Sequence, residues 1–336
     1  MRRNLLSIGL LACVFCAILQ AQTHIVPKPP FTSQDAERGD QLRAKSDQVR
    51  AEMTKMGNME PLPVKITDNF YSVGMLNGKA YLLTSPQGHI LFGGGYPDTG
   101  EIIEKNMQTF GFKLTDVKAI LITHYHDDAS GSASYLRQKS GAQVMVGFPE
   151  TVYLERGGVL PPPNQGRGAR AGEGSAPKLL YPPIKVDRAL FDGDSIKVGP
   201  LSVTAYVLPG HTLGSTSYEF TVREGNRDLK ALIFCCWEYP DDLSQNVNIS
   251  EAAARHIFEV FRKVLPVDIY MANGGYETSG ILNHPPNLTV PERVARYKAD
   301  NKVWVNRDIF RGLAASREVE FEQKLQKLKA TNPVYK

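Results

Sequence analysis

The chain has 336 residues, of which 42% are hydrophobic and 22% are charged, the ordinary balance of a folded globular protein rather than of a disordered or fibrous chain. Its length predicts one large domain or two smaller ones. The formal net charge of +4 is too small a positive surplus for a nucleic-acid-binding surface, so we expect no nucleic-acid partner.

The first 21 residues are organised like an export signal. Two arginines precede an apolar run from Leu5 to Leu19, and Ala21 provides a small residue at which a signal peptidase could cut. The run is shorter than the roughly 20 residues that span a bilayer, which favours cleavage over the alternative of an uncleaved anchor helix. We therefore expect residues 1–21 to be a signal peptide and the mature protein to be periplasmic or secreted, without membrane attachment.

Two of the four cysteines fall in this leader. The other two, Cys235 and Cys236, are neighbours at the end of an apolar run, where thiols commonly act as small hydrophobic side chains. Adjacent cysteines close only a strained ring, so we expect no disulfide framework in the mature chain.

Two regions follow the leader. Residues 22–60 predict a proline-rich arm and a polar helix over 33–55 that Ser33 caps, and residues 61–336 are expected to form the main domain. Within that domain, short β-rich runs separated by turn residues predict a meander of strands over 65–93. A helix is expected at about 99–111.

The middle of the chain begins with an uninterrupted apolar run over 117–123, which is typical of a strand buried on both faces. Ser130 is expected to cap the helix that follows. Residues 157–183 are rich in glycine and proline and predict a long loop, which is either a mobile loop near the functional face or an inert insertion.

The second half of the chain repeats this order. Three strand-rich stretches between Ala189 and Cys236 are followed by an expected helix at 250–264, an apolar run at 267–272 and an amphipathic helix at 313–330. The repetition of strands, helix, buried strand and helix predicts two packed sheets flanked by helices, with internally related halves.

Polar residues follow two of the predicted strands. His124, His126 and Asp128 alternate after the run over 117–123, so their side chains are expected to point the same way. His211 follows another strand, in a turn flanked by glycine. Imidazole and carboxylate groups bind transition metals, zinc above all. The pattern predicts a metal site, with separate surface histidines as the alternative.

These residues resemble the metallo-β-lactamase superfamily, and more narrowly its subclass B3. The run from Thr123 to Asp128 matches the first part of the family signature His-x-His-x-Asp-His, and Tyr181 to Gly199 is similar to the B3 middle segment, as is the Leu-Pro-Gly-His-Thr-Leu-Gly turn. The resemblance implies an α+β fold, the four-layer αββα sandwich. It also implies that a first zinc ion is held by three histidines: His124, His126 and His211.

The positions for a second zinc ion depart from the family pattern. Ala129 stands where the signature ends in histidine, and Asn273 stands where a further histidine is usual. Asp128 alone remains of the usual set, with Asn273 and His284 as weak candidates to complete it. The strand end at 93–95 also lacks the usual orienting aspartate, and such partners commonly change metal affinity or activity 10- to 100-fold. We expect one zinc ion and weak activity, and a second ion is left open.

The resemblance implies an exported hydrolase that opens a cyclic amide of the β-lactam type, and hence a connection with antibiotic resistance. Zinc would activate a water molecule, and Asp128 would orient it and move its proton towards the leaving group. One alternative is the same fold acting on a lactone, thioester or phosphoester, and another is a non-catalytic binding protein. For the hydrolases the expected partner is a small molecule, and the oligomeric state is not indicated.

Overall fold

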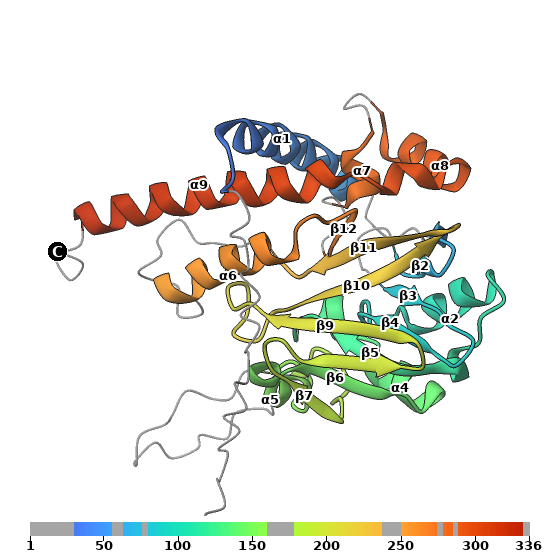
Figure 1. The fold of residues 1–336 in the computed structure, drawn as a ribbon. Helices are drawn as coiled ribbons and strands as arrows, with labels where there is room; N and C mark the ends of the chain where they lie inside the picture. Colours follow the sequence, from blue (N-terminus) through green and yellow to red (C-terminus); the bar gives the residue numbers. More distant parts are fainter. Residues whose placement is uncertain are drawn as a thin grey trace, which may run out of the picture.

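Two β-sheets pack face to face, with helices on both outer faces (Figure 1). The computed structural model describes residues 30–55, 63–75, 80–159, 178–236, 250–273, 278–284 and 288–331. The arrangement is the αββα sandwich expected from the sequence. The predicted signal peptide (1–21) and most of the loop predicted over 157–183 lie outside the described residues. Among the helices of the described residues, none has both the length and the apolar character needed to cross a membrane.

Within the described ranges, the first sheet has seven strands in the order β1-β2-β3-β4-β5-β6-β7. Neighbouring strands run antiparallel from β1 to β4 and parallel from β4 to β7. The first four confirm the predicted meander, and β5 is the strand predicted from the apolar run over 117–123. The strands are β1 (Val64–Thr67), β2 (Phe70–Ser72), β3 (Tyr81–Leu83), β4 (His89–Phe92), β5 (Val117–Ile122), β6 (Gln143–Gly147) and β7 (Arg188–Leu190).

The second sheet, as far as the structure describes the chain, has five strands in the order β12-β11-β10-β9-β8. Its strands are β8 (Ser195–Val198), β9 (Leu201–Val207), β10 (Thr216–Glu224), β11 (Arg227–Phe234) and β12 (Ile269–Ala272). Strands β8 to β11 are antiparallel, and β12 joins β11 in parallel. In both sheets an antiparallel pair is followed by a helix and a parallel strand, with α2 (Gly100–Gln108) and α6 (Glu251–Val264) as the helices. The predicted internal repetition is therefore present in the topology.

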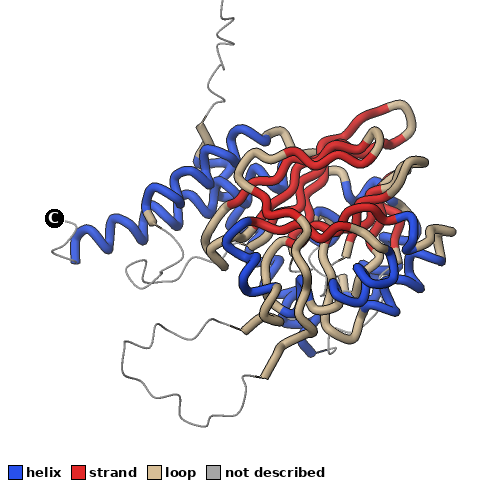
Figure 2. The backbone as a smooth tube through the Cα atoms, turned by 90° about the horizontal axis from the view of Figure 1, so that it is seen from below, coloured by secondary structure: helices blue, strands red, loops and turns tan. Residues whose placement is uncertain are grey.

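Apolar side chains hold the four layers together, and Figure 2 shows the strands lying between helices. Between the sheets, Phe92 of β4 stacks on Phe220 of β10, with ring centroids 4.7 Å apart. Helices α2 and α4 (Ala133–Ser140) cover the outer face of the first sheet, and α6 and α9 (Arg307–Thr331) cover the second. Strands covered on both faces are largely apolar, and β5 is buried at every residue except Lys118, which is why it could be recognised from its sequence.

The remaining helical elements are short and lie mostly in the connections. They are α3 (Asp127–Ser130), α5 (Thr151–Leu154), α7 (Ser279–Leu282) and α8 (Val290–Ala299), with the 3₁₀ turns η1 (Leu114–Asp116), η2 (Phe148–Glu150) and η5 (Asn301–Trp304).

The first helix, α1 (Ser33–Lys55), has the bounds predicted from the sequence, but its cap is one residue earlier than predicted. Thr32 Oγ1 accepts a hydrogen bond from Asp35 N at 3.1 Å, and the Asp35 carboxylate accepts one from Thr32 N at 2.9 Å. This reciprocal pair is a capping box. Because Ser33 and Thr32 are both capping residue types, the sequence alone did not distinguish them.

The prediction that Ser130 caps a helix is wrong. Ser130 is the last residue of α3, and Ser132 precedes α4. The Ser130 hydroxyl instead donates back to the main-chain oxygens of Tyr125 (3.0 Å) and His126 (2.8 Å). A serine that bonds to the preceding turn resembles a helix cap in sequence, because both roles use the same short hydroxyl side chain.

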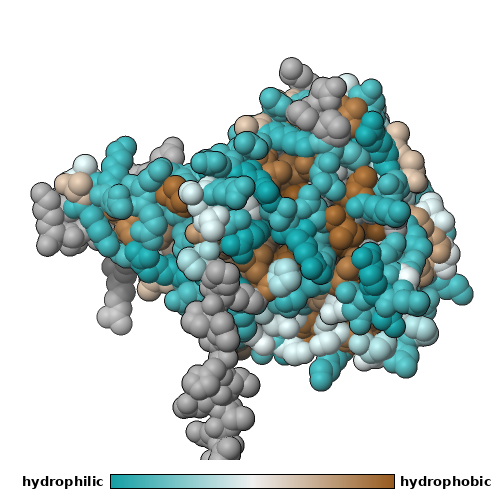
Figure 3. All heavy atoms as spheres, turned by 45° about the horizontal axis from the view of Figure 1, so that its top comes forward, coloured by the Kyte–Doolittle hydropathy of each residue, from teal (hydrophilic) through white to brown (hydrophobic). Residues whose placement is uncertain are grey.

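Helices α1 and α9 lie side by side along one face of the molecule (Figure 1). Gly39 allows this close approach, because a Cβ atom there would lie 2.5 Å from Ser316 Cβ and would also overlap the main-chain oxygen of Gly312. Two hydrogen bonds of 2.9 Å join Arg311 to the Asp35 carboxylate across the same contact. Figure 3 shows a largely hydrophilic surface on this side, with apolar patches between the polar side chains.

We expect Gly39→Ala to lower the free energy of unfolding by about 1–3 kcal/mol, the usual effect of overpacking. This should occur although alanine favours helix more than glycine does. Urea unfolding would measure it, with the exposed neighbour Gln41→Ala on the same helix as control. If the alanine at position 39 left the unfolding midpoint unchanged, the close α1–α9 contact would be contradicted.

Candidate metal centre

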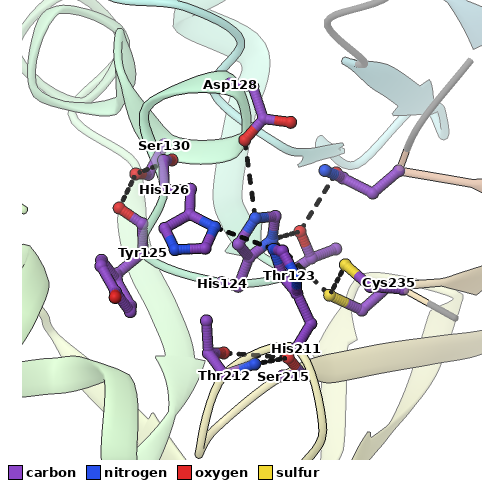
Figure 4. Close-up of polar contacts among 12 residues, drawn as sticks. Thr123, His124, Tyr125, His126, Asp128, Ser130, His211, Thr212, Ser215 and Cys235 are labelled. Carbon is purple, nitrogen blue, oxygen red and sulfur yellow. Dashed lines mark hydrogen bonds and ion pairs between the residues drawn. The ribbon is translucent and has the colours of Figure 1, made fainter. Parts of the chain in front are cut away.

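Three histidines meet where β5 and β9 end, at one edge of the sandwich (Figure 4). His124 and His126 follow β5, and His211 lies in the turn between β9 and β10. The three pairs of ring centroids are 4.8, 4.7 and 4.6 Å apart. One ring nitrogen from each histidine lies within 4.8 Å of the others. The structure thus brings the three predicted ligands together, two from the first sheet and one from the second.

The arrangement of nitrogen atoms fits a metal ion of the zinc type. His124 Nε2 is buried and makes no hydrogen bond to any described residue. His126 Nδ1 and His211 Nε2 face each other at 2.8 Å. Three imidazole nitrogens converging on one point, with further coordination left to water or substrate, are a recognised set of ligands for catalytic zinc.

Asp128 reaches the same site by a route that differs from the prediction. His126 has extended backbone, but α3 begins directly after it, so the alternation along an extended chain does not continue to Asp128. The aspartate instead points in from the first turn of α3, with its Oδ1 atom 3.5 Å from His124 Nε2 and its side chain 32% exposed. Asp128 therefore lies beside the histidines, as predicted. The predicted reason, alternation along an extended chain, is wrong for this residue, because Asp128 belongs to α3.

Asn273, one of the two weak candidates for a second metal, lies behind the histidines. It follows β12 and is buried, and its Oδ1 atom accepts a hydrogen bond of 3.1 Å from Thr123 Oγ1. Its side-chain oxygen is therefore engaged by the residue that precedes His124. Ala129 is fully buried in α3 and has no donor atom.

The other weak candidate, His284, packs elsewhere. It follows α7, and its buried ring stacks on Tyr297 with centroids 5.3 Å apart. Burial lowers the pKa of His284 to about 4, and three nearby cations add to the effect: Arg293, Arg296 and Lys45. Among the described residues, His284 belongs to no group that could hold a metal.

Comparison with known proteins agrees with this fold. Residues 73–224 match the family model of the metallo-beta-lactamase superfamily. The chain contains a metallo-beta-lactamase superfamily domain. The Rm3 metallo-beta-lactamase is similar in structure, with 29% identity, a TM-score of 0.65, and 81% of this chain and 96% of that chain covered. BJP-1, a subclass B3 metallo-beta-lactamase of Bradyrhizobium japonicum, is 26% identical with a TM-score of 0.62. The match covers 83% of this chain and 98% of that chain.

Curated relatives are similar over a shorter region. A probable metallo-hydrolase of Burkholderia pseudomallei is 28% identical over 171 residues, which are 49% of this chain and 54% of the relative. A hydroxyacylglutathione hydrolase of a Bradyrhizobium species is 29% identical over 155 residues, 46% of this chain and 44% of the relative. The chain spans about half the length of the curated relatives it matches. The matched region thus belongs to a superfamily in which these relatives are named as hydrolases.

The cysteine pair of this metallo-beta-lactamase domain lies against a predicted ligand. Cys235 Sγ is 3.6 Å from His124 Nδ1 and 2.7 Å from Cys236 Sγ, and Thr123 Oγ1 is 3.1 Å from the same nitrogen. Partners on the second ring nitrogen orient a ligating histidine. The interpretation of the cysteines as core side chains is therefore incomplete, because Cys235 is buried but also contacts the candidate metal centre.

The charges around His124 favour a positive charge at this point. Burial opposes protonation of the ring, but the Cys235 sulfur and the Asp128 carboxylate raise the pKa of His124 to about 10. For Cys235, burial raises the pKa, and the hydrogen bond from Cys236 together with His124 lowers it well below the usual value. These surroundings stabilise a cation at the histidine cluster, as a metal site requires.

Sequence reasoning missed the residues that hold the ligand turns in place. The buried Glu150 accepts main-chain hydrogen bonds from Tyr125 and Gly214, and the Tyr181 hydroxyl donates to the main-chain oxygen of Tyr125. No short motif marks these contacts. The one feature of the sequence that could have indicated them is an acidic residue, Glu150, placed three residues after a strand that is buried along most of its length.

We expect His211→Ala to abolish metal binding, because it removes one of three ligands. The measurement is zinc per chain by elemental analysis after desalting, which should fall from about one to near zero. His256→Ala is the control, since this histidine of α6 is exposed and contacts Asp192 instead. Zinc retained by the His211 variant would contradict its assignment as a ligand, and two zinc ions in the unaltered chain would contradict a single site.

Proposed function

We propose that this protein is an exported zinc-dependent hydrolase that opens cyclic amides of the β-lactam class. The observation that carries the proposal is the meeting of His124, His126 and His211 beside Asp128. The solved neighbours that share 26–29% identity over about four fifths of this chain support the substrate class, because their names identify them as metallo-beta-lactamases. Export, to the periplasm or the medium, rests on the signal sequence expected at residues 1–21.

The proposed reaction needs a nucleophile, an acceptor for its proton, and a donor for the leaving nitrogen. A zinc ion held by three histidines supplies a water molecule whose pKa is lowered to about 7. Asp128 is partly exposed at the rim of the histidine cluster, where it would accept that proton. The same carboxyl group would then protonate the amide nitrogen as the ring opens.

The residues at the two candidate second-site positions, Ala129 and Asn273, determine how fast we expect turnover to be. Ala129 has no donor atom, and the side-chain oxygen of Asn273 is engaged by Thr123. Without a second cation to stabilise the departing nitrogen, its stabilisation depends mainly on protonation by Asp128. We therefore propose a single-zinc enzyme with slow turnover.

A second candidate function is thioester hydrolysis. It is favoured by the hydroxyacylglutathione hydrolases among the sequence relatives, of which two Bradyrhizobium proteins are 29% and 28% identical over 155 residues. Attack on an acyl carbon is common to both reactions, so the histidine cluster serves either one. The leaving groups differ, because a thiolate departs without a proton and an amide nitrogen does not.

We expect Asp128→Asn to lower kcat for β-lactam opening by about 10²–10⁴-fold, the usual contribution of a positioned acid or base. Hydrolysis of a penicillin, a carbapenem and a hydroxyacylglutathione would be compared in the same preparations. Asp127→Asn, at the neighbouring position of α3, is the matched control.

The outcomes of this comparison separate the candidates. Ring opening that depends on Asp128 supports the β-lactam proposal. Cleavage of the thioester alone, with intact lactam rings, would favour the second candidate. Zinc-loaded protein that leaves every substrate intact would contradict both and support the non-catalytic alternative.

A further inference from the structure

Glu150 lies between the two turns that carry the histidines. It ends the 3₁₀ turn η2 after β6, and none of its surface is exposed. Its Oε2 atom accepts a hydrogen bond of 2.8 Å from Tyr125 N, and its Oε1 atom accepts one of 2.7 Å from Gly214 N. Tyr125 stands between His124 and His126, and Gly214 is three residues after His211. One carboxylate is therefore bonded to both ligand-bearing segments.

Two glycines make this bridge short. A Cβ atom at Gly214 would lie 2.7 Å from Glu150 Cγ and 3.0 Å from Glu150 N. A Cβ atom at Gly147, at the end of β6, would lie 2.5 Å from Gly214 O. Any larger residue at either position would force the turn after His211 away from β6 and from Glu150. The separation of the two ligand turns is therefore set by direct contact.

The chemistry of Glu150 suits a bridge between two main-chain donors. An ionised carboxylate has two acceptor oxygens and no donor, so it satisfies both N–H groups at once. In the described part of the chain Glu150 forms no ion pair with lysine or arginine. Burial raises the pKa of Glu150, and the main-chain N–H groups of Gly214 and Tyr125, together with the neighbouring His124, oppose that rise. A buried carboxylate is costly unless compensated, and a cation at the histidine cluster would compensate it.

We propose that Glu150 is a positioning residue of the metal centre, which holds the Tyr125 and Gly214 turns together so that the three imidazoles converge. It contacts neither the metal nor the substrate, and it acts through the main chain of the ligand turns. The inference rests on the three-histidine zinc site of the proposed function. Its measurable consequence is zinc affinity, which does not depend on the identity of the substrate.

The decisive variant is Glu150→Gln, which keeps the size of the side chain. The amide nitrogen is a donor, so it cannot accept from either main-chain N–H, and at most one of the two hydrogen bonds survives. We expect the Kd for zinc, measured by competition with a chromogenic chelator, to rise about 10- to 100-fold, as for other partners of metal ligands. Glu150→Ala should raise it at least as much.

Asp268→Asn is the matched control. Asp268 is also buried, and its carboxylate accepts a main-chain hydrogen bond of 2.9 Å from Lys230 N and contacts Arg307. It precedes β12 and belongs to no candidate metal group among the described residues. Its substitution should lower the Tm and leave the zinc Kd unchanged, whereas Glu150→Gln should change the Kd.

The zinc Kd values of these variants test the positioning role of Glu150 directly. An unchanged zinc Kd in Glu150→Gln would overturn the positioning role while the zinc site stands. If the unaltered chain bound no zinc, the site and the positioning role would both fall. If Glu150→Gln did not fold, Gly214→Ala would take its place, since it displaces the carboxylate without removing it, and an unchanged Kd in that variant would overturn the proposal.

Discussion

The metal centre depends on a buried connection between the two sheets. Thr216 N, at the start of β10, donates a hydrogen bond of 2.8 Å to Thr123 O, just after β5. The Tyr218 hydroxyl donates one of 2.7 Å to Ile122 O. A buried polar group left without its partner costs about 1–3 kcal/mol, so these bonds oppose any sliding of one sheet past the other. The histidines of the first sheet are thereby held opposite the histidine of the second.

Asn273 makes a buried contact beside the histidine cluster. Asn273 occupies a place where the family pattern has a ligand, and its side-chain oxygen now accepts the Thr123 hydroxyl. This contact supports the residue next to His124. Through this hydrogen bond the residue that follows β12 is joined to the segment that carries His124.

The sequence predicted that the three histidines would meet, because each lies a few residues after the end of a strand, where a polar residue is easily seen after an apolar run. It predicted β5 and the two-sheet architecture for the same reason. The Glu150 and Cys235 contacts could not be predicted in the same way. Glu150 bonds to residues 25 and 64 positions away, and Cys235 contacts a residue 111 positions away. Such contacts exist only once the sheets have packed, and no local pattern encodes them.

The pairing of α1 with α9 has a consequence for the order of folding during synthesis. The ribosome makes α1 early, and the helix that covers it is the last element of the described chain. The three histidines, in contrast, all lie between residues 124 and 211. Contacts between distant parts of a sequence form slowly, and uncovered apolar surface in a partly made chain favours aggregation. The first helix therefore stays without its native partner until α9 has been made.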